Sequence, residues 1–132
     1  MYKKKISIIV TSLNSEKTIE KTLYSIANQT NNNFELIVID GNSTDKTVEL
    51  INKYKFIIDI FVSEKDLGIY DAINKGLSMT NCNYYLIVGS DDILYPNAVA
   101  TYLYNLDDSI DILTANYLYK NNIISLTKGP DW

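Results

Sequence analysis

The sequence predicts an α/β domain in which helices cover both faces of a mainly parallel sheet. Three observations lead to this prediction. Short apolar runs rich in β-branched residues alternate with segments whose apolar residues recur at helical spacing. Most of these runs end at a polar cluster, as strands in parallel sheets do at the edge where ligands bind. The 132 residues, 46% of them hydrophobic, suit a single globular domain spanning residues 1–132.

Two strand–helix units are expected in the first half of the chain. The apolar run Ile6 to Val10 is typical of a buried strand, and a helix is expected over Glu16 to Gln29. Phe34 to Ile39 is the second buried strand. A helix follows whose apolar stripe is Val48, Ile51 and Tyr54. The polar residues before these helices are the expected caps: Asn14 or Ser15 for the first, Ser43 or Thr44 for the second.

The second half continues the alternation. Ile57 to Val62 is a third, shorter strand, and Tyr84 to Val88 is the fourth. Between them a helix is expected around Ile69 to Met79, with its inward face on Ile69, Ala72, Ile73, Gly76 and Leu77. Pro96 suits the first turn of a last helix, whose buried stripe is Val99, Leu103 and Leu106. The segments Ile110 to Tyr119 and Ile123 to Leu126 flank an expected hairpin turn at Asn121-Asn122.

Composition excludes several classes of function. The net charge of −4 argues against a nucleic-acid partner, and the absence of histidine excludes His-based acid–base chemistry and His-ligated zinc. Cys82 is the only cysteine, so a reducing, cytoplasmic compartment is expected. No apolar run is long enough to span a bilayer. Lys3-Lys4-Lys5 is interpreted as a solvated flank, with weak attraction to a membrane surface as the alternative.

Polar clusters follow all four main strands. In a parallel sheet these ends share one edge, so the clusters are expected to form one rim. They are Thr11 to Asn14, Asp40 to Asp45, Glu64 to Gly68, and Ser90 to Asp92.

Asp91 and Asp92 at the end of the fourth strand are the strongest candidates for a metal site. Two neighbouring carboxylates repel each other unless a cation lies beside them, and oxygen ligands suit a hard divalent ion. The alternative is an ordinary turn, since Ser and Asp are common turn residues.

Two further rim segments are candidates for binding. Asp40 can accept a hydrogen bond from an imide or a ribose; the alternative is that it caps the following turn. Gly41 can let a ligand approach the backbone closely; the alternative is that it only makes the turn. Asp71 and Asn74 share one side of the third helix, where they are candidates for contact with a ligand. The alternative is that this side is only a solvated face. Gly76 within that helix indicates close packing or ligand approach.

With these segments in view, the chain resembles the N-terminal, nucleotide-sugar-binding half of a family 2 glycosyltransferase, specifically the bacterial surface-polysaccharide type. The resemblance implies a Rossmann-like GT-A fold. Gly41 stands where a second Asp is frequent in the family, and Ser90 stands where the metal motif usually has an acidic residue. The matching segments are Ile6 to Asn14, Val38 to Thr47, Glu64 to Gly76, and Ser90 to Pro96.

The resemblance also implies roles for individual residues. Asp40 would contact the base, and Asp92 would ligate Mn²⁺ or Mg²⁺ on the diphosphate. Asp91 would face the ribose. The remaining donor-binding residues would be Thr11, Leu13, Asn14 and Asn42 near the nucleoside, Asp66, Gly68 and Asn74 along the nucleoside and donor sugar, and Ser90 beside the metal motif.

The implied reaction is transfer of a sugar, with inversion, from a nucleotide donor to a surface-polysaccharide or lipid-linked acceptor. A UDP-sugar is the expected donor. The general base is expected beyond Trp132, in an acceptor-binding part that the chain is expected to lack. The full-length protein is expected to associate peripherally with the inner face of the membrane. The alternative is a non-catalytic nucleotide-binding α/β domain. A pyrophosphorylase is disfavoured because the loop Thr11 to Ser15 has no glycine, and a receiver domain because its phosphoacceptor Asp is missing after the third strand.

Overall fold

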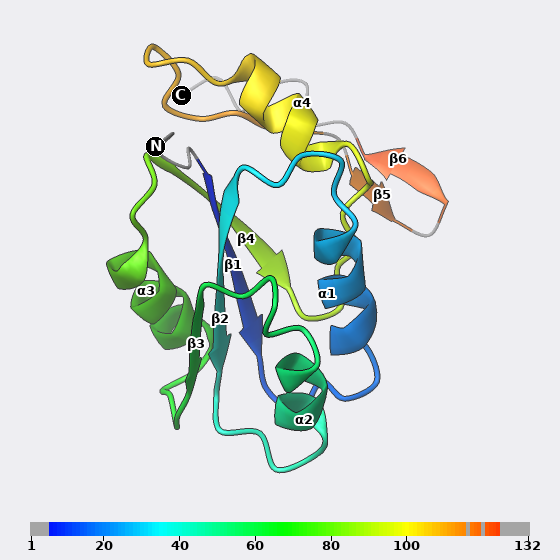
Figure 1. The fold of residues 1–132 in the computed structure, drawn as a ribbon, viewed down its shortest axis with the longest axis vertical. Helices are drawn as coiled ribbons and strands as arrows, with labels where there is room; N and C mark the ends of the chain where they lie inside the picture. The colour runs from blue at the N-terminus through cyan, green and yellow to red at the C-terminus, as the bar shows by residue number, and fades with distance from the viewer. Residues whose placement is uncertain (1–5, 116, 120, 125–132) are drawn as a thin grey trace.

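The computed structural model describes residues 6–115, 117–119 and 121–124. Strands and helices alternate along this part of the chain (Figure 1). The strands are β1 (Ile6–Ser12), β2 (Phe34–Asp40), β3 (Ile60–Ser63), β4 (Tyr84–Gly89), β5 (Tyr117–Tyr119) and β6 (Asn122–Ile124). The helices are α1 (Ile19–Ala27), α2 (Thr47–Asn52), α3 (Ile69–Met79) and α4 (Ala98–Asn105).

The first four strands form one parallel sheet in the order β3-β2-β1-β4. Because all four run in the same direction, their carboxyl ends lie at one edge, where the arrowheads gather in Figure 1. The register places Ser12 of β1 beside Asp40 of β2, and Asp40 beside Ser63 of β3. On the other side of β1, Thr11 is paired with Gly89 of β4. The sheet therefore brings the predicted polar strand ends together.

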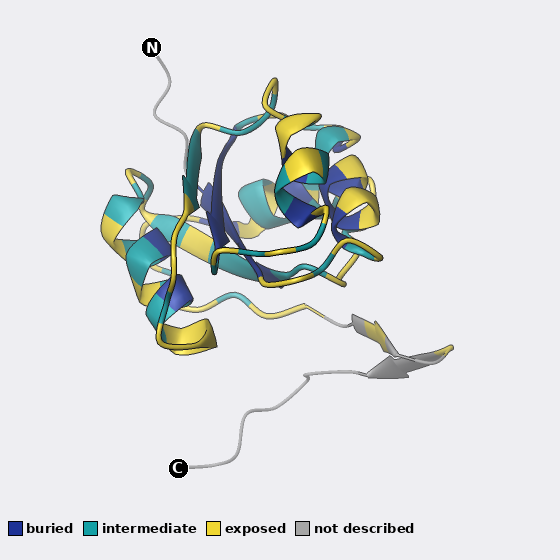
Figure 2. Ribbon diagram, turned by 90° about the horizontal axis from the view of Figure 1, so that it is seen from below, coloured by how far each residue is buried: buried dark blue, intermediate teal, exposed yellow. Residues whose placement is uncertain are grey.

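Helices cover both faces of this sheet, as predicted. On one face Ile8 and Val10 of β1 pack in a core with residues of α1, α2 and α4, including Ile19, Ile51 and Val99. On the other face a smaller core is built by Ile9, Ile37, Ile39 and Ala72, the last of which comes from α3. Strands β1 and β2 are buried along their whole length, and the helices keep an exposed outer side (Figure 2).

The α3 bounds agree with the prediction, whereas the two predicted sets of helix caps are wrong. Neither α1 nor α2 has a side-chain cap. Ser15 accepts the amides of Thr18 and Ile19 through its carbonyl oxygen, and the helix begins only at Ile19. Asn14 and Ser43 are used instead to join two loops, as described below.

Ile69 was expected to face inward but is 60% exposed, because the helix packs on the sheet through Ala72 and Gly76 one and two turns later.

The predicted hairpin is present but differs in detail. β5 and β6 pair antiparallel, and Asn122 lies within β6 opposite Tyr119 rather than in the turn. Asn121 has the positive φ of 63° that a tight turn favours. Leu126, predicted to end the second strand, and the cluster Lys3 to Lys5 lie outside the described residues. Among the residues that are described, no helix has the length and apolarity to cross a membrane.

Candidate functional site

Hydrogen bonds join the loops at the carboxyl edge of the sheet, which Figure 2 views from below. The loop after β1 is bound to the loop after β2, because the Asn14 amide donates to Ser43 Oγ (2.8 Å) and the Thr44 amide donates to Asn14 Oδ1 (2.9 Å). The same first loop reaches the end of β4 through the hydroxyls of Ser15 and Ser90, which lie 2.7 Å apart. The predicted convergence of these strand ends is therefore found in the structure.

Asp40 lies at the centre of this rim and is fully buried. Its Oδ1 accepts from the hydroxyls of Ser12 (3.0 Å) and Ser43 (2.5 Å). Its Oδ2 accepts from the Ser43 amide (2.9 Å) and the Ser63 hydroxyl (2.7 Å). Both oxygens are thus occupied within the protein. The bonds to Ser43 are the turn contact that the alternative expected of Asp40, and contact with a base stays a prediction.

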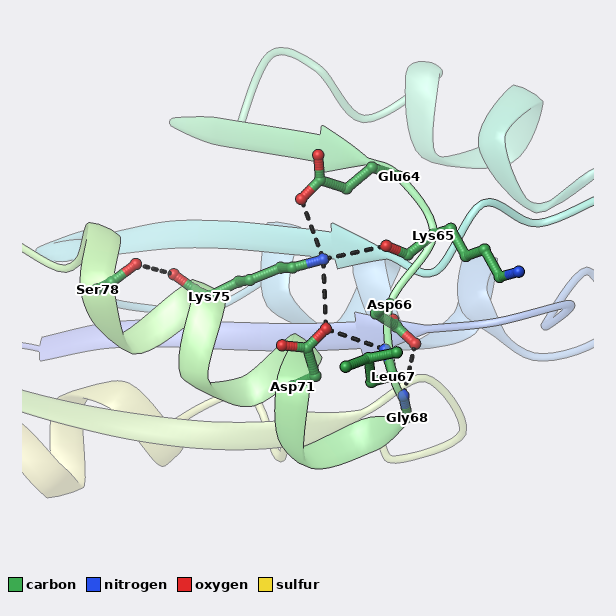
Figure 3. A network of polar contacts seen from close by, with 8 residues as sticks. All are labelled: Glu64, Lys65, Asp66, Leu67, Gly68, Asp71, Lys75 and Ser78. Carbon is green, nitrogen blue, oxygen red and sulfur yellow. Dashed lines mark hydrogen bonds and ion pairs between the residues drawn. The ribbon is translucent and has the colours of Figure 1, made fainter.

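The loop 64–68 is held by α3 (Figure 3). Lys75 Nζ lies 3.0 Å from Glu64 Oε1 and 3.5 Å from Asp71 Oδ2, and it donates to the carbonyl oxygen of Lys65 (3.3 Å). The Leu67 amide donates to Asp71 Oδ2 (3.0 Å). These contacts fix the loop 64–68 to α3.

These contacts shift two pKa values. The Leu67 amide lowers the pKa of Asp71 below its ordinary value; burial opposes this effect and Lys75 adds to it. The hydrogen bond to Glu64 raises the pKa of Lys75; burial opposes this effect, and Asp71 adds to it. Both groups thus favour their charged forms at neutral pH.

Asp66 and Gly68 complete this loop. Gly68 has a φ of 110°, which only glycine adopts readily, and its amide donates to Asp66 Oδ1 (3.0 Å). Asp66 Oδ2 lies over the loop after β2, 2.7 Å from the point where Gly41 would carry a Cβ atom. A side chain at position 41 would therefore displace the Asp66 carboxylate.

Asp91 and Asp92 follow β4 and are both exposed. The Gly89 amide donates to Asp92 Oδ2 (2.9 Å). Asp91 Oδ1 and Asp92 Oδ2 each lie 3.0 Å from the Cβ position of Gly89, so the two carboxylates converge on one small space. No cluster of three or more metal-ligating side chains occurs in the described part of the chain. Carboxylate oxygens of this kind fit a Mn²⁺ or Mg²⁺ ion, whose remaining ligands would have to come from outside these two side chains.

The other predicted residues occupy different positions around the rim. Thr11 is buried within β1, and Leu13 is 57% exposed. Asn42 and Asn74 are exposed. Asn42 lies in the loop after β2 and has a φ of 64°, in the left-handed region that Asn tolerates better than most residues. Within the described residues, no hydrogen bond joins the Asn74 side chain on α3 to the rim loops.

Sequence reasoning missed the residues that hold the site in place. Ser12, Ser43 and Ser63 surround Asp40. The available signal was a Ser at the ends of β1 and β3 and another three residues past the end of β2. Lys75 orders the loop 64–68, and its signal was the spacing of four residues from Asp71, which places the two charges on one side of a helix.

A family model described as "Glycosyl transferase family 2" matches residues 7–129, which is most of the chain. The chain belongs to glycosyl transferase family 2. The resemblance inferred from the rim segments is thereby confirmed, and with it the assignment to an enzyme family. Two curated relatives illustrate the match. A "PGL/p-HBAD biosynthesis glycosyltransferase" of Mycobacterium bovis is 38% identical over 92 residues, covering 67% of this chain and 36% of the relative.

The poly(ribitol-phosphate) β-N-acetylglucosaminyltransferase TarP of Staphylococcus aureus is 32% identical over 120 residues, covering 86% of this chain and 37% of TarP. This family 2 glycosyltransferase chain thus spans a little over a third of the length of these relatives.

Solved structures confirm the GT-A fold. S. aureus TarS 1-349 in complex with UDP-GlcNAc has a TM-score of 0.69 and 30% identity, covering 76% of this chain and 30% of TarS 1-349. A mannosyltransferase from Pyrobaculum calidifontis, in complex with GDP-Man and Mn²⁺, has a TM-score of 0.65 at 23% identity, covering 76% of this chain and 31% of that one. At that identity the second comparison bears on the fold alone.

Proposed function

We propose that this chain provides the donor and metal site of an inverting glycosyltransferase that moves a sugar from a nucleoside diphosphate to a surface-polysaccharide or lipid-linked acceptor. The observation that carries the proposal is the convergence of Asp91 and Asp92 on Gly89, beside the joined strand-end loops. Two exposed carboxylates repel a bare diphosphate, whereas a divalent cation held by Asp92 attracts it. The site is thus suited to a diphosphate that arrives with a cation.

A UDP-sugar is the proposed donor. TarS is 30% identical to this chain over the aligned region and has been solved with UDP and with UDP-GlcNAc. That likeness supports a uridine donor here. It says less about the sugar, because the chain covers only about a third of TarS 1-349.

Each rim segment has a role in the proposal. Asp92 would hold Mn²⁺ or Mg²⁺, which supplies charge neutralisation for the departing nucleoside diphosphate when bound. Asp91 would face the ribose. Ser90, anchored by Ser15, would fix the start of this turn. Thr11, Leu13, Asn14 and Asn42 would line the nucleoside, and Asp66, Gly68 and Asn74 the donor side.

Asp40 takes a different role from the one first expected. Its carboxylate fixes the ends of three strands from beneath the rim, so we propose that it positions the loops without touching the donor. The general base, expected beyond Trp132, and association with the inner face of the membrane stay predictions.

Calorimetry tests the proposal directly. UDP, GDP and dTDP are titrated into the chain with Mn²⁺ and with EDTA. UDP is expected to bind at least about tenfold tighter with Mn²⁺, and Asp92→Asn should remove this gain because the ligand loses its negative charge. Glu49→Gln, an exposed acidic residue on α2, is the charge-matched control. Equal binding of every nucleotide with Mn²⁺ and with EDTA would exclude the metal role, and failure of all three to bind would exclude a donor site.

A further inference from the structure

We propose that Asp66 recognises the N3–H group of a uracil base and that Gly41 is needed to make room for it. This inference rests on the proposed donor site and specifies how that site selects its nucleotide. Asp66 Oδ2 lies 2.7 Å from the Cβ position of Gly41, and the Cδ1 atom of Leu13 lies 3.4 Å from the same point. A carboxylate oxygen and an exposed apolar side chain therefore meet above one glycine.

This pairing suits a flat base. A base needs an apolar surface against its ring and a polar group at its edge. Leu13 offers the first and Asp66 the second. A carboxylate only accepts hydrogen bonds when ionised, so it favours a ring N–H and disfavours a ring nitrogen that carries a lone pair. Uracil presents N–H at position 3, whereas cytosine presents a lone pair there.

Asp66 combines a carboxylate oxygen that accepts no hydrogen bond within the described residues with a position beside an apolar side chain, that of Leu13. Asp40 accepts four hydrogen bonds and is buried. Asp45 accepts from Thr47 and from the Glu16 amide. Glu64 and Asp71 pair with Lys75. Asp66 accepts the Gly68 amide through Oδ1, and within the described residues no hydrogen bond reaches Oδ2.

The position of Asp66 relative to the metal candidates also fits a nucleoside. The Gly41 loop follows β2, and Asp91 and Asp92 follow β4, with β1 between them. Two strand spacings, roughly 10 Å, therefore separate the two ends of the site. A nucleotide spans about this distance from its phosphate to the far edge of its base, so a diphosphate at Asp92 would place the base near Asp66.

The loop that carries Asp66 is fixed to α3 by a network of polar contacts. Lys75 connects Glu64, the Lys65 carbonyl and Asp71, and Asp71 in turn accepts the Leu67 amide (Figure 3). Because the acceptor is held in place, little conformational freedom is lost on binding, and a misfitting base cannot easily be accommodated. The acceptor can therefore discriminate between bases as well as bind them.

Asp66→Asn gives the sharpest test. The Gly68 amide would keep the Asn carbonyl oxygen in the place of Oδ1, so the NH₂ group would take the place of Oδ2. An acceptor would become a donor at an almost unchanged shape. We expect wild type to bind UDP at least about tenfold tighter than CDP in the presence of Mn²⁺, and Asp66→Asn to bring this ratio to one or below.

Gly41→Ala provides an independent variant. Its Cβ atom would displace Asp66 Oδ2 without altering the charge, so the UDP-to-CDP ratio should fall as in Asp66→Asn. Glu49→Gln should leave the ratio unchanged, and circular dichroism melting verifies that each variant is folded. If UDP binds with Mn²⁺ but the ratio is the same in wild type and Asp66→Asn, the role of Asp66 is refuted while the donor site stands. If wild type binds neither nucleotide, both proposals fail together.

Discussion

Gly76 of α3 lies directly against Ile9 of β1. A Cβ atom added at position 76 would come within 2.5 Å of Ile9 Cγ2, closer than carbon atoms pack. The helix can therefore approach the sheet only because this residue has no side chain. Of the two reasons inferred from the sequence for a glycine inside this helix, close packing is the one that the structure supports.

Gly76→Ala should destabilise the protein, although alanine favours helices by about 1 kcal/mol over glycine. Overpacking a core costs about 1–3 kcal/mol, and Ile9 is fully buried and has little room to move. We expect a net loss of roughly 1–2 kcal/mol in the free energy of unfolding, measured by urea denaturation.

A double-mutant cycle isolates the contact. Ile9→Ala removes the methyl group that the new Cβ atom would strike, so adding Gly76→Ala to that variant should cost less than adding it to wild type. An equal cost in both backgrounds would mean that α3 is limited by another contact.

Much of this fold could be predicted because local patterns and tertiary packing agree. The four strands of the sheet were located within a few residues, and the bounds of α3 were predicted as they occur. The polar strand ends indicated the rim, since parallel strands must end at the same edge. Local signals were thus sufficient for the elements and for the location of the site.

The use of each carboxylate could not be predicted in the same way. Asp40 is enclosed because the register places Ser12 on one side of it and Ser63 on the other, residues that are far from it in the sequence. The proximity of Asp66 to Gly41 likewise depends on how two loops meet. A sequence shows which side chains reach a rim, but not which of their oxygens already accept hydrogen bonds within the protein.

Asp40→Ala should lower the free energy of unfolding by more than it lowers the free energy with which the folded protein binds a nucleoside diphosphate. The buried Ser12 hydroxyl and the partly buried donors of Ser43 and Ser63 would lose their shared acceptor. An unsatisfied buried donor costs about 1–3 kcal/mol, so we expect a loss of at least about 2 kcal/mol. Thermal and urea unfolding measure it. Asp66→Ala, at a partly exposed site, is the matched control and should change stability by no more than about 1 kcal/mol. Similar losses in the two variants would contradict the positioning role of Asp40.

Asp71 should titrate below its ordinary pKa of 3.8, because the Leu67 amide and then Lys75 stabilise its charged form more than burial opposes it. A carboxylate with a depressed pKa stabilises the fold above its unfolded pKa, and this contribution is lost as the pH falls through the folded value. The loop 64–68 should therefore loosen only below about pH 4. Carboxyl-carbon NMR follows the titration directly.

Lys75→Met tests the same network from its other side. The variant should raise the pKa of Asp71, but only part of the way to 3.8, since the Leu67 amide is the larger cause of the shift. Lys21, an exposed lysine on α1, gives the matched control Lys21→Met, which should leave Asp71 unchanged. An Asp71 titration unaffected by Lys75→Met would show that the ammonium group does not act on it in solution.

Gly89→Ala should weaken metal-dependent binding while leaving the fold intact. The added methyl group would lie 3.0 Å from both Asp91 Oδ1 and Asp92 Oδ2, so the two exposed carboxylates would have to move apart. Such side chains move easily, and we expect the free energy of unfolding to change by less than about 1 kcal/mol. Asp92 would be moved away from the ion that it is proposed to hold, so UDP affinity with Mn²⁺ should fall about tenfold, as expected when a supporting contact of a metal site is disturbed. In EDTA the variant and wild type should bind UDP equally, because only the metal-dependent part is altered. A loss of UDP affinity that is the same with Mn²⁺ and with EDTA would mean that Gly89 serves the nucleotide directly and that the convergence of the two carboxylates does not form the metal site.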